Sequence, residues 1–128
     1  MARKIFFGID FDGTLVEHCF PEIGADIGAF EWLHRFADRS KYILFTCRGG
    51  EHCDAAVAHI EAQGIELYGV NRNPTQHHWS DSPKAYCNIY VDDAFLGAPL
   101  HYPADGRRPY IKWELAGPLL IPIVEGFK

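Results

Sequence analysis

The sequence predicts an α/β fold, a three-layer, Rossmann-like parallel sheet with helices on both faces. Short apolar runs alternate along the chain with stretches in which apolar residues recur every three or four positions. This alternation is typical of strands joined by right-handed helical crossovers, which build a parallel sheet covered on both sides. Polar residues follow directly on several apolar runs, and such sheets bind ligands beyond the carboxyl ends of their strands.

The four expected strands are apolar runs that stop at charged, hydroxyl or turn residues. They span residues 4–10, 42–46, 65–70 and 86–91. One helix is expected at 27–37, and a second around the stripe formed by Cys53, Ala56, Val57 and Ile60. Residues 71–83 are polar and rich in turn formers, so they predict a loop.

A chain of 128 residues has the usual size of one domain, and we expect a single domain over residues 1–128. The tail from 96 to 128 is rich in proline, so we expect it to be irregular, with at most a short helix within 111–120. Its many apolar residues predict that it packs on the domain or on another subunit, which favours a homo-oligomer.

Composition excludes several classes of function. A formal net charge of −5 disfavours nucleic-acid binding, which requires a basic face. No apolar run approaches the roughly 20 residues that span a bilayer, and the first apolar run is too short for a signal peptide. The four cysteines form no CxxC pair or zinc-ligand spacing. These features predict a cytoplasmic protein without membrane contact.

Three polar clusters follow three expected strands and should therefore meet at one edge of the sheet. They are Asp10 with Asp12, Thr46 with Arg48, and Asp92 with Asp93. Four carboxylates in one place repel one another unless a cation lies among them, and an oxygen-only ligand set suits magnesium (Mg2+). The sequence therefore predicts a metal site formed by these carboxylates.

Further groups near the same edge suit a phosphorylated substrate. The Gly13 amide can point at an anion, Thr46 offers a hydroxyl, and Lys84 and Arg48 offer positive charge. Two carboxylates at one strand end can also divide the chemistry. One attacks phosphorus, and the other protonates the leaving group and then activates water.

Residues 10–15 (DFDGTL) resemble the first motif of the haloacid dehalogenase (HAD) superfamily, which is DxDGT followed by an aliphatic residue. The strand that ends in Thr46 is similar to the second motif of that superfamily, and Asp92 with Asp93 resembles the fourth. Lys84 is the only lysine between these two motifs, so it is the candidate for the third, with Lys41 or Lys112 as substitutes.

The resemblance implies that Asp10 is the nucleophile and a magnesium ligand. It implies that Asp12 is the general acid/base and binds the metal through its main-chain carbonyl. Thr46 would bind the transferring phosphoryl group, Lys84 would neutralise it, and Asp92 and Asp93 would complete the metal site. Gly13, Thr14 and Arg48 are the expected substrate contacts. An aspartate at position 12 is typical of the phosphatases of this superfamily, so we expect a phosphomonoester hydrolase acting through an aspartyl-phosphate.

Members of this superfamily often carry a cap domain, and we expect a capless member because only residues 17–25 are free to form a small flap. The alternative is a receiver-like signalling domain that accepts phosphate without turnover. Its acceptor aspartate would end a later strand, whereas DxDGT here follows the first. The sequence leaves open the roles of His18, His77 and His78, and the identity of the substrate.

Overall fold

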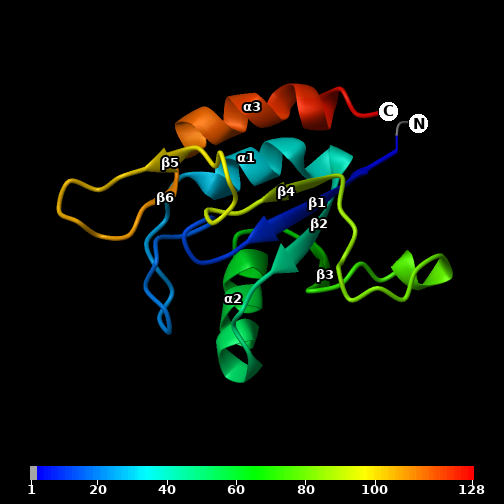
Figure 1. The fold of residues 1–128 in the computed structure, drawn as a ribbon, viewed down its shortest axis with the longest axis horizontal. Helices are drawn as coiled ribbons and strands as arrows, with labels where there is room; N and C mark the ends of the chain where they lie inside the picture. Colours follow the sequence, from blue (N-terminus) through cyan, green and yellow to red (C-terminus); the bar gives the residue numbers. More distant parts are fainter. Residues whose placement is uncertain (1–2) are drawn as a thin grey trace.

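Four parallel strands form the central sheet in the order β3-β2-β1-β4 (Figure 1). They are β1 (Ile5–Asp10), β2 (Ser40–Phe45), β3 (Leu67–Val70) and β4 (Ile89–Val91). The computed structural model describes residues 3–128 and confirms the predicted α/β class with a Rossmann-like sheet. The chain moves outward from β1 to β3 and then returns to the other side of β1, so the topological switch point lies between β1 and β4.

The three longer helices share one buried cluster with a single face of the sheet. They are α1 (Ala29–Phe36), α2 (Gly50–Ala62) and α3 (Trp113–Glu125), and α1 continues into the 3-10 helix η1 (Ala37–Arg39). Alternate residues of β1, namely Ile5, Phe7 and Ile9, point into this cluster. Figure 1 shows α3 alongside α1. Within residues 3–128, no helix combines the length and apolar character needed to cross a membrane.

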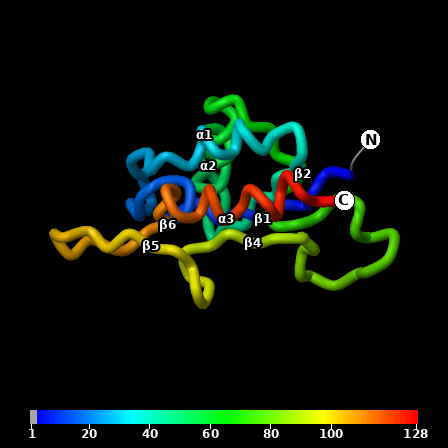
Figure 2. The backbone as a smooth tube through the Cα atoms, turned by 90° about the horizontal axis from the view of Figure 1, so that it is seen from above, coloured from blue at the N-terminus to red at the C-terminus, as the bar shows by residue number. Residues whose placement is uncertain are grey.

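The opposite face is covered by the loop at residues 71–88, which lies across the sheet from α1 and α2 (Figure 2). We expected helices on both faces, but this loop contains only the 3-10 helix η2 (Gln76–His78). In this loop, hydrogen bonds from side-chain amides hold the backbone in the way that main-chain hydrogen bonds do in a helix. Buried Gln76 donates to the Lys84 carbonyl at 2.9 Å and accepts from the Tyr86 amide at 2.7 Å. Asn73 donates to the Tyr86 carbonyl at 3.1 Å, so the backbone around Lys84 is fixed in place.

The tail is more ordered than the sequence indicates. The strands β5 (Leu100–His101) and β6 (Tyr110–Ile111) form an antiparallel pair, and α3 runs through Pro118 and Pro122. Both prolines are exposed, so water can satisfy the carbonyls that they leave without a partner. The buried stripe on the other side of α3 fixes the helix to the core, and its members are Trp113, Ala116, Leu120 and Val124.

The tail also supports the loop that follows β1. The Ile111 amide donates to the Gly13 carbonyl at 2.8 Å, and the Trp113 indole donates to the Thr14 carbonyl at 2.7 Å. Residues distant in sequence therefore hold the DxDGT loop in a fixed conformation. The expectation of an irregular tail is corrected accordingly.

Candidate active site

Three carboxylates meet at the switch point between β1 and β4. Asp10 ends β1, and Asp92 and Asp93 follow β4. One oxygen from each of these three residues lies within 4.8 Å of the others, and each residue is partly buried. The structure thus brings these residues together as the sequence predicts, and we refer to them as the carboxylate cluster.

The carboxylate cluster concentrates negative charge in a partly dry site. Burial, followed by repulsion from Asp92, raises the pKa of Asp10 to about 8, although the Thr14 hydroxyl opposes the shift. Burial likewise raises the pKa of Asp92, and the neighbouring Asp93 adds to that increase. A cation among these oxygens would relieve both costs, because it neutralises like charges that desolvation makes expensive. The donor set therefore fits a hard divalent ion.

Thr14 is an internal support of the carboxylate cluster. Its fully buried hydroxyl donates to Asp10 Oδ2 at 2.9 Å and accepts from the Asp93 amide at 3.1 Å. A single hydroxyl therefore links the end of β1 to the residue after β4. We expected Thr14 to contact substrate, and this geometry does not fit that role because both partners are internal.

Gly13 occupies a position that only glycine fits. Its φ is +82°, and a Cβ at this residue would overlap the His18 ring and lie 2.6 Å from Asp93 Oδ2. Its amide donates to the Val16 carbonyl at 2.8 Å. The expectation that this amide binds an anion is therefore not met. Glycine is required here because the His18 and Asp93 side chains occupy the space that a Cβ would need.

His18 is a member of the site whose role the sequence left open. Its Nε2 lies 2.7 Å from Asp93 Oδ2, although it belongs to the segment between β1 and α1. We call residues 17–25 the flap. The Glu17 amide donates to the Ala25 carbonyl at 2.9 Å, which closes the flap on itself. The Glu17 carboxylate also pairs with Arg107 of the β5–β6 connection.

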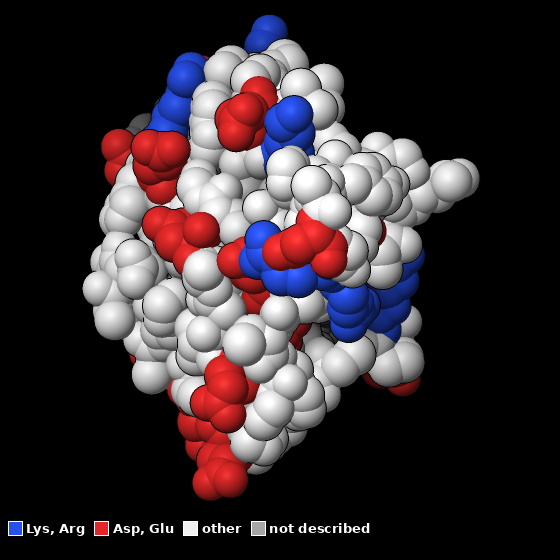
Figure 3. Space-filling view, turned by 90° about the vertical axis from the view of Figure 1, so that its left-hand side faces the viewer, with Lys and Arg blue, Asp and Glu red and all other residues white. Residues whose placement is uncertain are grey.

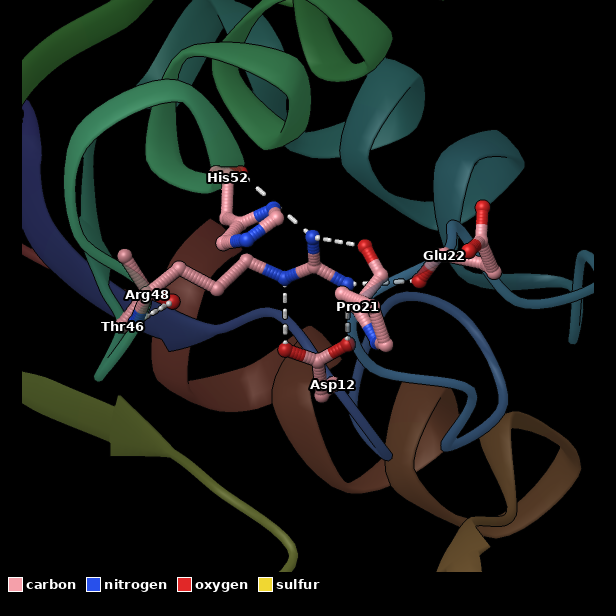
Figure 4. A network of polar contacts seen from close by, with 6 residues as sticks. All are labelled: Asp12, Pro21, Glu22, Thr46, Arg48 and His52. Atoms are coloured by element: carbon pink, nitrogen blue, oxygen red, sulfur yellow. Dashed lines mark hydrogen bonds and ion pairs between the residues drawn. The ribbon is translucent and has the colours of Figure 1, made fainter.

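Asp12 lies apart from the carboxylate cluster and pairs with Arg48 (Figure 4). Arg48 Nε and Nη2 each donate to a different oxygen of Asp12 at 2.8 Å. Arg48 is only 4% exposed, and the hydrogen bonds to Asp12 raise the pKa of its guanidinium. The expected Arg48–substrate contact does not fit a side chain so deeply enclosed. The expected Asp12 metal ligand is its main-chain carbonyl, and that stays a prediction.

A cavity of about 390 Å³ opens beside Asp10 and Asp92. Lys84 lies on its wall, with its Nζ 5.5 Å from the centre of the Tyr90 ring. Lys41 lies near the opposite end of the sheet, because it is the second residue of β2. The position therefore favours Lys84 as the cation of this site. Three aromatic side chains line the same cavity, namely Phe45, Tyr90 and Phe95.

Thr46 follows β2 and faces the same edge of the sheet. Its backbone amide and carbonyl pair with the Asn71 side chain at 2.9 and 3.1 Å, which fixes the strand end. Its hydroxyl accepts from the Arg48 amide at 3.0 Å. One lone pair is thereby used while the hydroxyl proton stays free to donate to a phosphate oxygen.

His77 and His78 lie away from the carboxylate cluster. Their rings stack in η2 with centroids 4.1 Å apart, and neither lines the cavity beside Asp10. His77 Nδ1 lies 2.9 Å from the Pro74 carbonyl, so it belongs to the internal bonding of the loop.

Charge on the face toward which β1 points is mixed. In Figure 3, acidic atoms are spread over the upper, left and lower parts of this face, and basic atoms lie at the top and upper left, at the centre and toward the right. The visible face therefore lacks the broad basic surface that nucleic-acid binding requires.

Comparison with known proteins supports the fold. No family model matches the chain, and no curated protein matches it. The solved structure of a conserved protein from Bacteroides thetaiotaomicron is similar, with a TM-score of 0.71 and 29% sequence identity. The match covers 98% of this chain and 94% of that chain, so the likeness extends over the whole fold.

Proposed function

We propose that this chain is a magnesium-dependent phosphomonoester hydrolase (a phosphatase) that forms an aspartyl-phosphate on Asp10. The observation that carries the proposal is the convergence of Asp10, Asp92 and Asp93 at the switch point, beside a cavity that Lys84 lines. The resemblance of DFDGTL to the first HAD motif supplies the reaction class. On this proposal the protein is a capless member of that superfamily.

Asp10, Asp92 and Asp93 would hold the magnesium ion, together with the Asp12 carbonyl. Bound there, the ion would neutralise phosphate charge and favour the ionised form of Asp10. The raised pKa of Asp10 supports this reading, because burial and the neighbouring carboxylates disfavour its charged form and a bound cation would favour it.

The proposed reaction consists of two displacements at phosphorus. Asp10 attacks phosphorus and the bond from phosphorus to the ester oxygen breaks. Asp12, once it has left its pair with Arg48 and taken up a proton, gives that proton to the ester oxygen. A water then attacks the phosphorus of the aspartyl-phosphate and gives its proton to Asp12, which releases phosphate and restores Asp10. Thr46 donates to a phosphoryl oxygen, and Lys84 offsets the charge of the group in transfer.

The cavity beside Asp10 favours a leaving group that carries a ring. Phe45, Tyr90 and Phe95 supply apolar, polarisable walls, and successive rings lie 5.5 and 6.3 Å apart.

The four free cysteines agree with a reducing cytoplasm.

The test is release of phosphate from p-nitrophenyl phosphate by purified protein, with and without magnesium. We expect metal-dependent turnover that Asp10→Asn abolishes. Full activity in the Asp10→Asn variant would contradict the proposal. A long-lived phosphoprotein without turnover would favour the receiver-like alternative instead.

A further inference from the structure

The cavity beside Asp10 offers few polar side chains to the leaving group of a substrate. Asp10 and Asp92 are expected metal ligands, and Lys84 is the expected partner of the phosphoryl group. Among the described residues that line the cavity, the remaining polar side chains are those of Asn71 and Tyr90. The selectivity of the cavity therefore depends on whether these two are free to bind a ligand.

Asn71 and Tyr90 are both engaged with the backbone. The Asn71 side chain pairs with the amide and the carbonyl of Thr46 at 2.9 and 3.1 Å. The Tyr90 hydroxyl donates to the Ala85 carbonyl at 2.8 Å and accepts from the Cys87 amide at 3.0 Å. Each hydrogen-bonding atom of these two side chains thus already has a partner. A sugar hydroxyl placed here would lose water without replacement, which is costly.

The apolar wall of the cavity is built on the sheet itself. The Phe45 ring lies against Gly8 of β1, because a Cβ at Gly8 would overlap this ring and lie 2.9 Å from Cys87 Sγ. The Tyr90 ring lies beside it, with the two centroids 5.5 Å apart, and the contacts of its hydroxyl hold it there. These two rings therefore form a surface that exists before a ligand binds.

Phe95 extends this surface toward solvent. Its side chain is 49% exposed, and its ring meets that of Tyr90 at 69°, with centroids 6.3 Å apart. The Phe95 amide donates to the Asp92 carbonyl at 3.2 Å, which ties the ring to the loop that carries the expected metal ligands. A ring bound next to Asp10 can therefore cover the exposed part of Phe95, and aromatic rings attract one another in such arrangements.

We propose that the site takes phosphomonoesters whose leaving group is a flat, apolar ring, and that Phe95 is the residue that selects for this ring. The inference rests on the proposed phosphatase function and adds the substrate class to it. The ring enters the cavity against Tyr90 and Phe95, while Lys84 holds the charge of the phosphoryl group. Sugar phosphates are disfavoured, because their hydroxyls find no partner among these walls.

The test compares three phosphate esters of primary alcohols, so that the reactivity of the leaving oxygen is nearly matched. Benzyl phosphate carries an apolar ring, glucose 6-phosphate carries a polar ring, and ethyl phosphate carries none. We expect kcat/KM for benzyl phosphate to exceed that for each of the others by at least about 10-fold.

Equal values of kcat/KM, in a protein whose turnover requires magnesium and Asp10, would overturn the inference and leave the proposed function standing. No turnover of any ester, p-nitrophenyl phosphate included, would contradict the proposed function and the substrate class with it.

Variants at the mouth of the cavity test the role of Phe95. Phe95→Ala should lower the ratio of kcat/KM for benzyl phosphate to that for ethyl phosphate by about 10-fold, and Phe95→Tyr should retain the ratio because it keeps the ring. Leu96→Ala is the matched control, because Leu96 is the next side chain, is fully exposed and does not line the cavity. An unchanged ratio in Phe95→Ala, or an equal fall in Leu96→Ala, would overturn this role.

Two phosphonates separate recognition of the ring from the chemical steps. Phenylphosphonate and methylphosphonate contain no ester bond, so neither proton transfer nor a covalent intermediate affects their binding. As competitive inhibitors of p-nitrophenyl phosphate turnover, they should differ by at least about 10-fold in inhibition constant, with phenylphosphonate the tighter. Phe95→Ala should remove most of this difference. A difference that persists in full in that variant would contradict selection by Phe95.

Discussion

Asp10 and Asp12 belong to one five-residue motif, and yet their environments are opposite. Asp10 sits in a group of three carboxylates, where burial and Asp92 raise its pKa to about 8. Asp12 is matched by a buried guanidinium that meets both of its oxygens. Within residues 3–128, no lysine or arginine forms an ion pair with Asp10, whereas Arg48 forms one with Asp12.

The two aspartates of the motif differ in whether a side-chain cation balances their charge. The three carboxylates without a guanidinium partner are the ones that fit a metal ion, whereas Arg48 already neutralises Asp12. Neighbours in sequence are separated here by the turn after β1, which Thr14 and Gly13 fix from inside.

The largest expected effect is the loss of the proposed nucleophile. Asp10→Asn keeps the shape of the side chain but cannot form the aspartyl-phosphate, so kcat should fall by about 10⁴-fold or more. Steady-state release of phosphate measures it. Retention of even a tenth of the activity would break the contrast between the two aspartates.

Asp12→Asn should have the next largest effect. An amide cannot supply a proton to the leaving group, so we expect kcat/KM on phenyl phosphate to fall by about 10²- to 10³-fold. The affinity for magnesium should stay nearly unchanged, because Asp12 is outside the carboxylate cluster. A large loss of metal affinity, measured by calorimetric titration, would contradict this division.

His18 tests the expected metal site through its contact with Asp93. Its ring lies 2.7 Å from Asp93, so it orients one of the expected ligands. We expect His18→Ala to weaken magnesium binding by about 10-fold, the usual effect of losing such a partner. His77→Ala is the control, because His77 lies outside the cavity. Equal effects of both substitutions would argue against a specific role.

The smallest expected effect concerns stability without metal. The pKa of Asp10 is raised from 3.8 to about 8 by folding, so the folded chain retains a proton that the unfolded chain loses between these values. The stabilising contribution is present below pH 4 and is lost as the pH rises toward 8. In metal-free protein, Asp10→Asn should therefore gain at least about 1 kcal/mol over the parent at pH 8, and less at pH 5. Urea unfolding at both values checks this, and a gain independent of pH would contradict it.

The sheet and the carboxylate cluster were predictable because strand ends carry a strong local pattern. Asp10, Asp92 and Asp93 each follow an apolar run, and a parallel topology then brings them together. The internal use of Thr14, Gly13 and Arg48 was not predictable, since their partners are mostly backbone groups. A carbonyl such as that of Pro21 or Glu22 has no sequence signature.

The helix α3 in the tail was not predictable from the sequence for a related reason. Prolines at 118 and 122 predict interruption, but both face water, and the buried stripe on the other side of α3 dominates. His18 likewise lacked a pattern, because its contact with Asp93 depends on how the flap folds back.

If Asp10 carries the phosphoryl group, mass spectrometry of Asp12→Asn after mixing with p-nitrophenyl phosphate and magnesium will detect it there. This variant can still form the intermediate from an activated substrate but hydrolyses it slowly. We predict that one phosphoryl group accumulates on the peptide that contains Asp10, and that none accumulates when Asp10→Asn is added. A phosphoryl group on another residue, or turnover with no labelled peptide in either variant, would contradict it.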